Sequence, residues 1–234
     1  MVIKNKTAHL ISRPVSMTAL AVLTTVLAAC SSTPSAAINP VNTSPQHTTS
    51  PSTSQPAPNT SYQSAENKQR LIVEHSKQIQ SYLAKGQFDK LISFLHPTKG
   101  VRFSMYAYVQ PGVDKVFSRE QFETYLKQSR IKFTWGHKDG KGDLYVTPLP
   151  DYLSTWVKAE DFNNISPTYN QFQGSGNSLN NLQEAYPNAQ FVEFYNSGMN
   201  PEYQGMDWRA LRLVFEEYQG QYYLVAIIND QWTV

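Results

Sequence analysis

Charged side chains stand beside tryptophan at two places near the C-terminal end of the chain. Asp207-Trp208-Arg209 precedes one run of alternating apolar residues, and Asp230-Gln231-Trp232 follows the next run. A carboxylate next to an aromatic ring offers a ligand both a hydrogen-bond acceptor and a flat apolar surface. Aromatic residues among strands are usually core, so a packing role is the alternative for each of them. The complete set of candidate ligand-binding residues is Arg102, Tyr106, Trp135, Glu193, Asp207, Trp208, Asp230 and Trp232.

The histidines and the glycine-rich segments form no pattern that carries chemistry. His75, His96 and His137 are never four residues apart, as a zinc site on one helix requires. Residues 139–143 (Asp-Gly-Lys-Gly-Asp) lack the acidic run and final glutamate of a calcium loop, which favours a hairpin turn. Gly174-Ser175-Gly176 lacks the G-x-S-x-G spacing of a nucleophile elbow. These motifs predict no catalytic residue, no metal site and no cofactor.

The N-terminal segment differs in character from the rest of the chain. Residues 1–29 begin with basic residues, and their apolar part, 17–26, is shorter than the about 20 residues that a membrane span needs. They end in Leu27-Ala28-Ala29-Cys30, which resembles a bacterial lipobox. This resemblance implies that residues 1–29 are a cleaved signal peptide and that Cys30 carries a lipid. Because Ser31 follows and not Asp, similarity to Gram-negative envelope sorting implies the outer membrane, facing the periplasm.

Residues 30–64 are predicted to be the lipidated Cys30 and a disordered tether. Between 31 and 64 there are 21 Ser, Thr or Pro residues among 34 and no Asp, Glu, Lys or Arg. Such a segment buries too little apolar area to offset the entropy of ordering it. A plain tether and an O-glycosylated stalk both fit this composition.

The charge of the chain excludes one class of partner. Without the three basic residues of the signal peptide, Lys+Arg falls from 20 to 17 against 18 acidic residues. A nearly neutral protein lacks the positive surface that nucleic acid or an anionic membrane attracts. We therefore expect no nucleic-acid partner. The expected partners are the membrane, through the lipid, and an unidentified ligand or envelope protein.

The folded domain is predicted to be residues 65–234. Apolar residues at helical spacing between 71 and 83 predict a long helix, ended by Gly86. A short helix at 88–95, a strand at 101–109 and a helix with a Ser118–Gln121 capping box follow. We then expect paired strands at 131–135 and 144–147, a helix ending near 157, and a long loop with room for one helical turn at 158–188.

Three strands are predicted at the C-terminal end, at 189–196, 208–218 and 222–229. Gln219-Gly220 joins the last two in a tight hairpin. Leu211, Leu213 and Phe215 alternate with Arg212, Val214 and Glu216, which predicts one core face and one partly wet face. Helices followed by an antiparallel meander indicate an α+β domain. Its order of elements resembles the nuclear transport factor 2-like cone, in which N-terminal helices pack on a curved, mostly antiparallel sheet.

Four segments are similar to a family of bacterial envelope lipoproteins without an assigned reaction. They are H-P-T-K-G-V-R-F-S-M-Y-A-Y-V (96–109), W-G-H-K-D-G-K-G (135–142), G-M-D-W-R-A-L-R-L-V-F-E (205–216) and I-I-N-D-Q-W-T-V (227–234). The resemblance extends over about residues 86–234. It implies the envelope location and supplies no catalytic residues.

Three functional hypotheses follow. The first is a lipid-anchored envelope domain that binds a small molecule, a glycan or a protein partner. The second is an envelope hydrolase or isomerase that uses a pocket carboxylate such as Asp207 or Glu193. The third is a structural assembly factor, which would show a large exposed apolar patch. A closed pocket holding a desolvated carboxylate favours the enzyme, and a shallow aromatic groove favours the binder.

Overall fold

The structure, a computed structural model, describes residues 60–234. The predicted signal peptide, Cys30 and the tether up to residue 59 lie outside the described residues. Within residues 60–234, no helix combines the length and the apolar composition needed to cross a membrane.

The long N-terminal helix is α1 (Thr60–Ala84), which begins inside the last residues assigned to the tether. Ile72, Ile79 and Leu83 are buried, and their spacing of seven and four residues places them on one helix face. Gly86, with φ of +67°, takes the left-handed conformation that commonly follows a helix end. The predicted helix and its stop at Gly86 are therefore confirmed.

The other elements are short helical turns and eight strands. The helical elements are the 3-10 helix η1 (Phe88–Phe94), α2 (Arg119–Lys127), α3 (Leu149–Tyr152), the π-turn η2 (Leu153–Val157), the 3-10 helix η3 (Ala159–Phe162), α4 (Leu182–Ala185) and the 3-10 helix η4 (Pro201–Tyr203). The strands are β1 (Val101–Ser104), β2 (Lys115–Phe117), β3 (Phe133–His137), β4 (Leu144–Thr147), β5 (Thr168–Tyr169), β6 (Gln190–Asn196), β7 (Arg209–Tyr218) and β8 (Gln221–Gln231).

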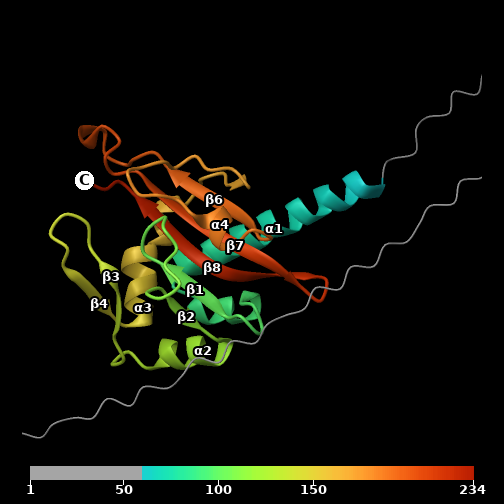
Figure 1. Cartoon of the computed structure of the whole chain (residues 1–234), viewed down its shortest axis with the longest axis horizontal. Coiled ribbons are helices and arrows are strands. Elements are labelled where there is room, and N and C mark those ends of the chain that lie inside the picture. The colour runs from blue at the N-terminus through green and yellow to red at the C-terminus, as the bar shows by residue number, and fades with distance from the viewer. Residues whose placement is uncertain (1–59) are drawn as a thin grey trace, which may run out of the picture. The chain divides into compact units, whose positions relative to one another are not determined.

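Six strands form one curved sheet in the order β2-β1-β8-β7-β6-β5, and β3 and β4 form a separate hairpin (Figure 1). Only β1 and β8 pair in parallel; the other strands of the sheet pair antiparallel. Gln219 and Gly220 both have positive φ, at +51° and +76°. That combination gives the tight turn whose twist matches the flanking strands. The described part is thus α+β with a mostly antiparallel sheet, as predicted.

The capping box at the start of α2 is present. The Ser118 hydroxyl accepts a hydrogen bond from the Gln121 amide (3.2 Å), and the Gln121 side chain accepts one from the Ser118 amide (2.9 Å). These two bonds satisfy backbone donors that a helix start leaves free. Phe122 in α2 is fully buried, so the cap fixes where this side chain enters the core.

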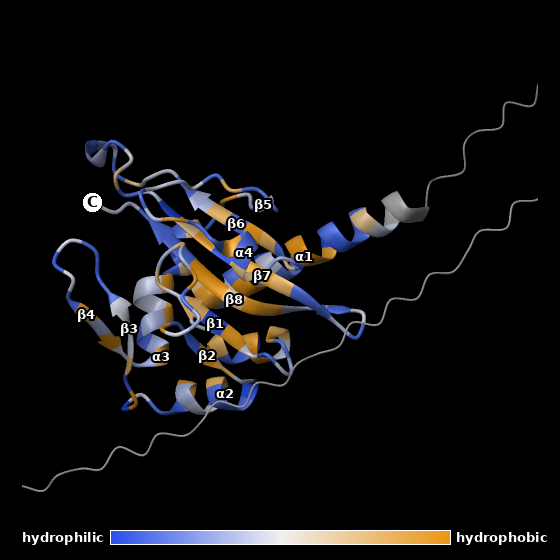
Figure 2. Ribbon diagram, viewed as in Figure 1, coloured by the Kyte–Doolittle hydropathy of each residue, from blue (hydrophilic) through white to orange (hydrophobic). Residues whose placement is uncertain are grey.

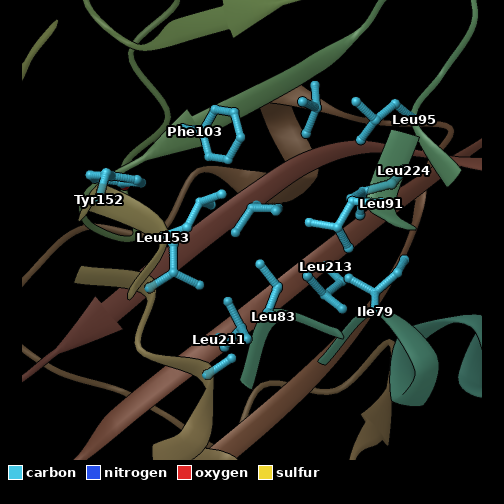
Figure 3. Packing of buried hydrophobic residues seen from close by; sticks show 14 of the residues in the cluster. Ile79, Leu83, Leu91, Leu95, Phe103, Tyr152, Leu153, Leu211, Leu213 and Leu224 are labelled. Atoms are coloured by element: carbon cyan, nitrogen blue, oxygen red, sulfur yellow. The ribbon is translucent and has the colours of Figure 1, made fainter. Parts of the chain in front are cut away.

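The main core lies between one face of the sheet and the helices. Figure 3 shows Ile79 and Leu83 of α1 close to Leu211 and Leu213 of β7, with Phe103 of β1 nearby. All five side chains are buried. Colouring by hydropathy shows the middle of β7 and β8 as apolar and the tip of their hairpin as polar (Figure 2). The hairpin therefore supplies the centre of the core.

The other face of the sheet is also covered, which corrects the expectation of a partly wet face. Arg212 and Val214 are fully buried, and only Glu216 keeps partial exposure. Val214, Ala226 and Ile228 pack in a second core with Leu182 of α4. The cover comes from residues 170–189, where the sequence predicted a loop. Apolar residues do not recur at helical or strand spacing in this segment, so the sequence did not indicate that it packs on the sheet.

Other predicted elements differ in extent, and the strand predicted at 131–135 is observed as β3, two residues further along the chain. The strand predicted at 101–109 ends at Ser104, because residues 105–108 bend away from the sheet. The long loop predicted at 158–188 contains η3, β5 and α4. Residues 105–110 leave the sheet where the cavity described below opens.

Candidate functional site

A cavity of about 590 Å³ lies between four segments that are distant in the sequence. It is bordered by residues 106–110, the β3–β4 turn at 137–142, residues 177–179 and the chain end at 233–234. Figure 1 shows the C-terminal end close to the β3–β4 turn. This volume falls within the range of about 300–1,000 Å³ that small-molecule sites occupy. We call it the outer cavity.

A smaller hollow of about 270 Å³ adjoins the outer cavity. The two share Tyr106, Tyr108, Gln110 and His137 in their walls. We call this the inner hollow, and it is bounded further in by Met105, Val113, Asp114, Trp135 and Gly136. A ligand in the outer cavity therefore has a second, more enclosed space beside it.

Hydrogen bonds fix the walls of the outer cavity to one another. The Asp139 amide donates to the Tyr106 hydroxyl (2.8 Å), and the Asp139 carboxylate accepts from the Val234 amide (2.7 Å). The Tyr106 ring packs edge-on against Trp156, with ring centroids 5.6 Å apart. Burial raises the pKa of the Tyr106 hydroxyl, so the phenol stays neutral. The β3–β4 turn and the chain end are thus held by Asp139.

Tyr108 and Gln110 present free surface to the cavity. Tyr108 is 46% exposed and lines the cavity, so part of its ring is available to a ligand. Gln110 is also exposed, and its side chain can both donate and accept hydrogen bonds. The cavity therefore offers an aromatic face and an amide side by side.

Asp114 is the carboxylate of the inner hollow. Its side chain is only 5% exposed. Within the described residues its Oδ2 atom accepts hydrogen bonds from the Ser104 hydroxyl (2.6 Å) and from the backbone N–H of Gln110 (2.9 Å). Arg102 Nη1 lies 3.7 Å from the same oxygen. No hydrogen bond within residues 60–234 ends on Oδ1, and Asp114 is one of the residues that line the hollow. Burial raises the pKa of the Asp114 carboxyl, and the neighbouring donors offset only part of this effect.

The raised pKa of Asp114 gives a test of its environment by pH. The folded state keeps the proton at pH values where the unfolded chain has lost it, so this group stabilises folding less as pH rises above about 4. Arg102 from β1, Tyr152 from α3 and Tyr186 are ionisable groups that interact with Asp114. We expect wild type to lose stability relative to Asp114→Asn as pH increases, in urea unfolding at several pH values. A difference that is constant with pH would contradict the desolvated carboxyl.

The sequence-predicted site residues fall into three separate groups, and in the first group Tyr106 and Trp135 border the outer cavity or the inner hollow, whereas Arg102 does not. Tyr106 lines both spaces, whereas Trp135 stands at the back of the inner hollow, 2% exposed. The Trp135 ring stacks on Tyr152 with centroids 3.8 Å apart, so its role is mainly packing. Arg102 does not line the cavity; it lies behind Asp114 and donates to the Tyr186 hydroxyl (3.0 Å).

The second group lines a separate depression of about 350 Å³ at the end of β7 and β8. Trp208 is buried there, and Trp232 is 39% exposed. The Asp207 carboxylate accepts hydrogen bonds from the amides of Met199 (2.8 Å) and Asn200 (2.9 Å), which lower its pKa. Asp207 therefore holds its own loop together, and it is not poised as a base.

The third group is a buried ion cluster on the face of the sheet that the second core covers, which we call the outer face of the sheet. Arg212 Nε donates to Glu193 Oε2 (2.7 Å), and Arg212 Nη2 donates to Asp230 Oδ2 (2.9 Å). The side chains of Arg212 and Glu193 are fully buried and that of Asp230 is 2% exposed. Neither Glu193 nor Asp230 lines the outer cavity, the inner hollow or the depression at the end of β7 and β8.

Sequence reasoning missed Asp114 and Arg212 altogether. Asp114 follows Pro111-Gly112, a turn signal that gave no reason to expect burial. Arg212 stands in the alternating pattern of β7 at a position expected to face water. The exposed Tyr108 belonged to an aromatic strand pattern and was indistinguishable from a core residue. Within residues 60–234, no group of three His, Cys, Asp or Glu side chains is placed to hold a metal ion.

Comparisons with known proteins leave the family open. No family model matches the chain, and no curated protein matches it. Among solved structures, it is similar to one described as a calcium/calmodulin dependent protein kinase II association domain from Xanthomonas campestris, at 12% sequence identity. The alignment covers 66% of this chain and 81% of that chain, with a TM-score of 0.26. A likeness this weak carries no argument about fold or function.

Proposed function

We propose that the protein is a lipid-anchored envelope lipoprotein whose domain binds a small polar ligand, of the saccharide class, in the outer cavity. The observation that carries the proposal is the cavity itself, which sets exposed Tyr108 beside Gln110 and continues into a hollow ending at Asp114. The anchor rests on the lipobox-like Leu27–Cys30, and the cone of the nuclear transport factor 2-like type rests on the curved sheet packed against α1.

The chemistry of the walls favours a neutral, hydroxyl-rich ligand. Ring faces of sugars pack on aromatic side chains, and their hydroxyl groups need both donors and acceptors. Gln110, Asn177 and Ser178 supply such groups in the outer cavity, and the Asp114 carboxyl is a further polar group in the inner hollow. Lys138 is the one cationic residue among the wall residues within the described part of the chain, so the walls do not select for an anion.

The positions of the segments that resemble the lipoprotein family also support the outer cavity as the binding site. The segment 96–109 supplies Tyr106 and Tyr108, 135–142 supplies most of the β3–β4 turn, and 227–234 supplies Thr233 and Val234. Three of the four segments therefore meet around one cavity. A protein whose distinguishing segments were only core would not be expected to gather them at a surface opening.

Tyr108→Ala tests the binding proposal. We expect the affinity for soluble N-acetylglucosamine oligomers of two to four units, titrated by calorimetry, to fall about tenfold, equivalent to about 1.4 kcal/mol. The reason is the loss of the ring face against which a sugar packs. Tyr203→Ala is the matched control, because Tyr203 is similarly exposed at 53% but lies in η4, away from the cavity. Equal affinity in both variants, or no binding of these oligomers or of maltotriose by wild type, would overturn the proposal.

An enzyme acting at the same cavity is the second candidate, and Asp114 is the observation in its favour. A desolvated carboxylate in an enclosed hollow is a common form of general acid or base. The two carboxylates first considered for this role, Asp207 and Glu193, do not face the cavity. Mass analysis of the same titration mixtures separates the candidates. Unchanged oligomers support the binder, whereas shortened or isomerised oligomers support the enzyme.

A further inference from the structure

Residues 172–179, which we call the strap, cross the outer face of the sheet above the buried ion cluster. The amides of Gln173 and Gly174 both donate to Glu193 Oε1, the latter at 3.0 Å. Arg212 Nη2 donates to the carbonyl oxygen of Gly174 (3.0 Å). Three backbone groups of the strap are therefore bonded to two charged side chains of the sheet.

The ion cluster spans three neighbouring strands. Glu193 of β6 lies directly opposite Arg212 of β7, and Asp230 of β8 completes the cluster. The Phe172 ring lies over the Arg212 guanidinium at 5.0 Å and stacks on Phe191 with centroids 4.4 Å apart. The fork of the guanidinium thus reaches both sheet carboxylates and the strap at once.

The strap fits closely onto the sheet because two of its residues have no side chain. A Cβ atom added at Gly176 would lie 2.6 Å from the Trp208 ring, and one added at Gly174 would lie 2.9 Å from the Ala210 Cβ. Both distances are shorter than a normal van der Waals contact. The glycines therefore let the strap backbone come within hydrogen-bonding distance of the cluster.

The other end of the strap forms a wall of the outer cavity. Asn177, Ser178 and Leu179 line it, and Asn177 Nδ2 donates to the Thr233 carbonyl oxygen (3.1 Å). Only two residues separate Asn177 from Gly174. A shift of Gly174 on the sheet would therefore move this wall.

We propose that Arg212 is a positioning residue for the cavity: it latches the strap at Gly174 and so fixes the wall formed by Asn177–Leu179. A buried ion group is expensive to desolvate, and apolar residues would hold three strands together as well. Apolar residues, however, cannot form hydrogen bonds with the backbone N–H and C=O groups of the strap. The ion cluster forms these hydrogen bonds. The inference concerns the same cavity. Only its ligand-binding test rests on the proposed function; the position of the strap can be tested without a ligand.

Arg212→Lys and Gly174→Ala test the latch in two different ways. Lysine keeps the charge but lacks the fork that reaches Glu193 and Gly174 together. The Gly174→Ala variant keeps the charges of Arg212, Glu193 and Asp230, but its added Cβ atom pushes the strap away from the sheet. Val214→Ala is the control, because Val214 is buried on the same face of β7 but belongs to the apolar part of the second core.

Amide hydrogen exchange of Gln173 and Gly174 is the first readout. We expect exchange at least about tenfold faster in both test variants than in Val214→Ala, with denaturant used to match global stability. Exchange equal to that of the control in both variants would overturn the latch. If Arg212→Lys does not fold, Gly174→Ala decides the question by itself.

Calorimetric binding of the N-acetylglucosamine trimer is the second readout. We expect about tenfold weaker binding in the two strap variants and unchanged binding in Val214→Ala. Unchanged binding together with fast strap exchange would overturn the link from strap to wall. Absence of binding by wild type would instead overturn the proposed function, while the exchange measurement would still decide whether Arg212 latches the strap.

Discussion

Leu213→Ala is expected to lower the free energy of unfolding by about 2–5 kcal/mol, the range for truncating a buried leucine. Leu213 is fully buried in β7, and Figure 3 shows it among Ile79, Leu83 and Leu91, which come from α1 and η1. The cavity left behind lies where the sheet and both helical elements meet, so neighbouring side chains can close it only in part. Against a total stability of about 5–15 kcal/mol, the loss is severe.

Urea unfolding of residues 60–234 followed by circular dichroism measures this effect. Leu144→Ala is the control, since Leu144 in β4 is 56% exposed and its truncation removes little buried area. The control is expected to stay within about 0.5 kcal/mol of wild type. A Leu213→Ala midpoint indistinguishable from that of the control would contradict the position of the closing hairpin at the centre of the core.

The elements that sequence reasoning predicted well are those whose signals are local. The capping box needs only Ser118 and Gln121, three residues apart, and the hairpin needs only the Gln219-Gly220 pair between two apolar runs. In both cases backbone hydrogen bonds or φ values decide the outcome within a few residues. Such features depend little on what the rest of the chain does.

The second face of the sheet was mispredicted because its cover has no periodic signal. Arg212 lies between Leu211 and Leu213 in β7, so its side chain is on the opposite face of the sheet from these two core residues. An arginine opposite a core face normally faces water. Its burial depends on the strap, which covers it with the Phe172 ring and with backbone groups that come close to the sheet at Gly174 and Gly176. Only the three-dimensional arrangement brings strap, Glu193 and Asp230 to the same arginine.

The candidate site was predicted in part for a related reason. Tyr106 was among the expected ligand-binding residues, but Tyr108 and Gln110 are exposed only because the chain leaves the sheet after Ser104. Asp114 becomes the carboxylate of the hollow through a loop that folds back on Ser104. Trp208 and Trp232 were also among the expected ligand-binding residues, and they line a depression that is separate from the outer cavity. Loop geometry, which sequence patterns specify poorly, decides each of these positions.

Cys30→Ser is expected to abolish lipid attachment completely, because the thiol is the only cysteine side chain in the chain and hydroxyl oxygen does not replace it in this modification. Each buried methylene of an acyl chain contributes about 0.8 kcal/mol to membrane binding, so several chains together give a stable anchor. In cells fed a clickable palmitate analogue, wild type should carry the label and fractionate with the outer membrane. The variant should be unlabelled and keep the mass of the precursor with residues 1–29.

Ser31→Ala is the matched control, because it changes a neighbouring small residue while leaving the thiol and Leu27–Ala29 intact. It should label and fractionate as wild type does. We expect binding to be independent of the proposed anchor: a Cys30→Ser protein released from its precursor should bind N-acetylglucosamine oligomers with wild-type affinity, since residues 60–234 contain every wall residue. Wild type that is unlabelled, or a mature N-terminus other than Cys30, would refute the lipoprotein assignment and leave the binding proposal to be judged on Tyr108 alone.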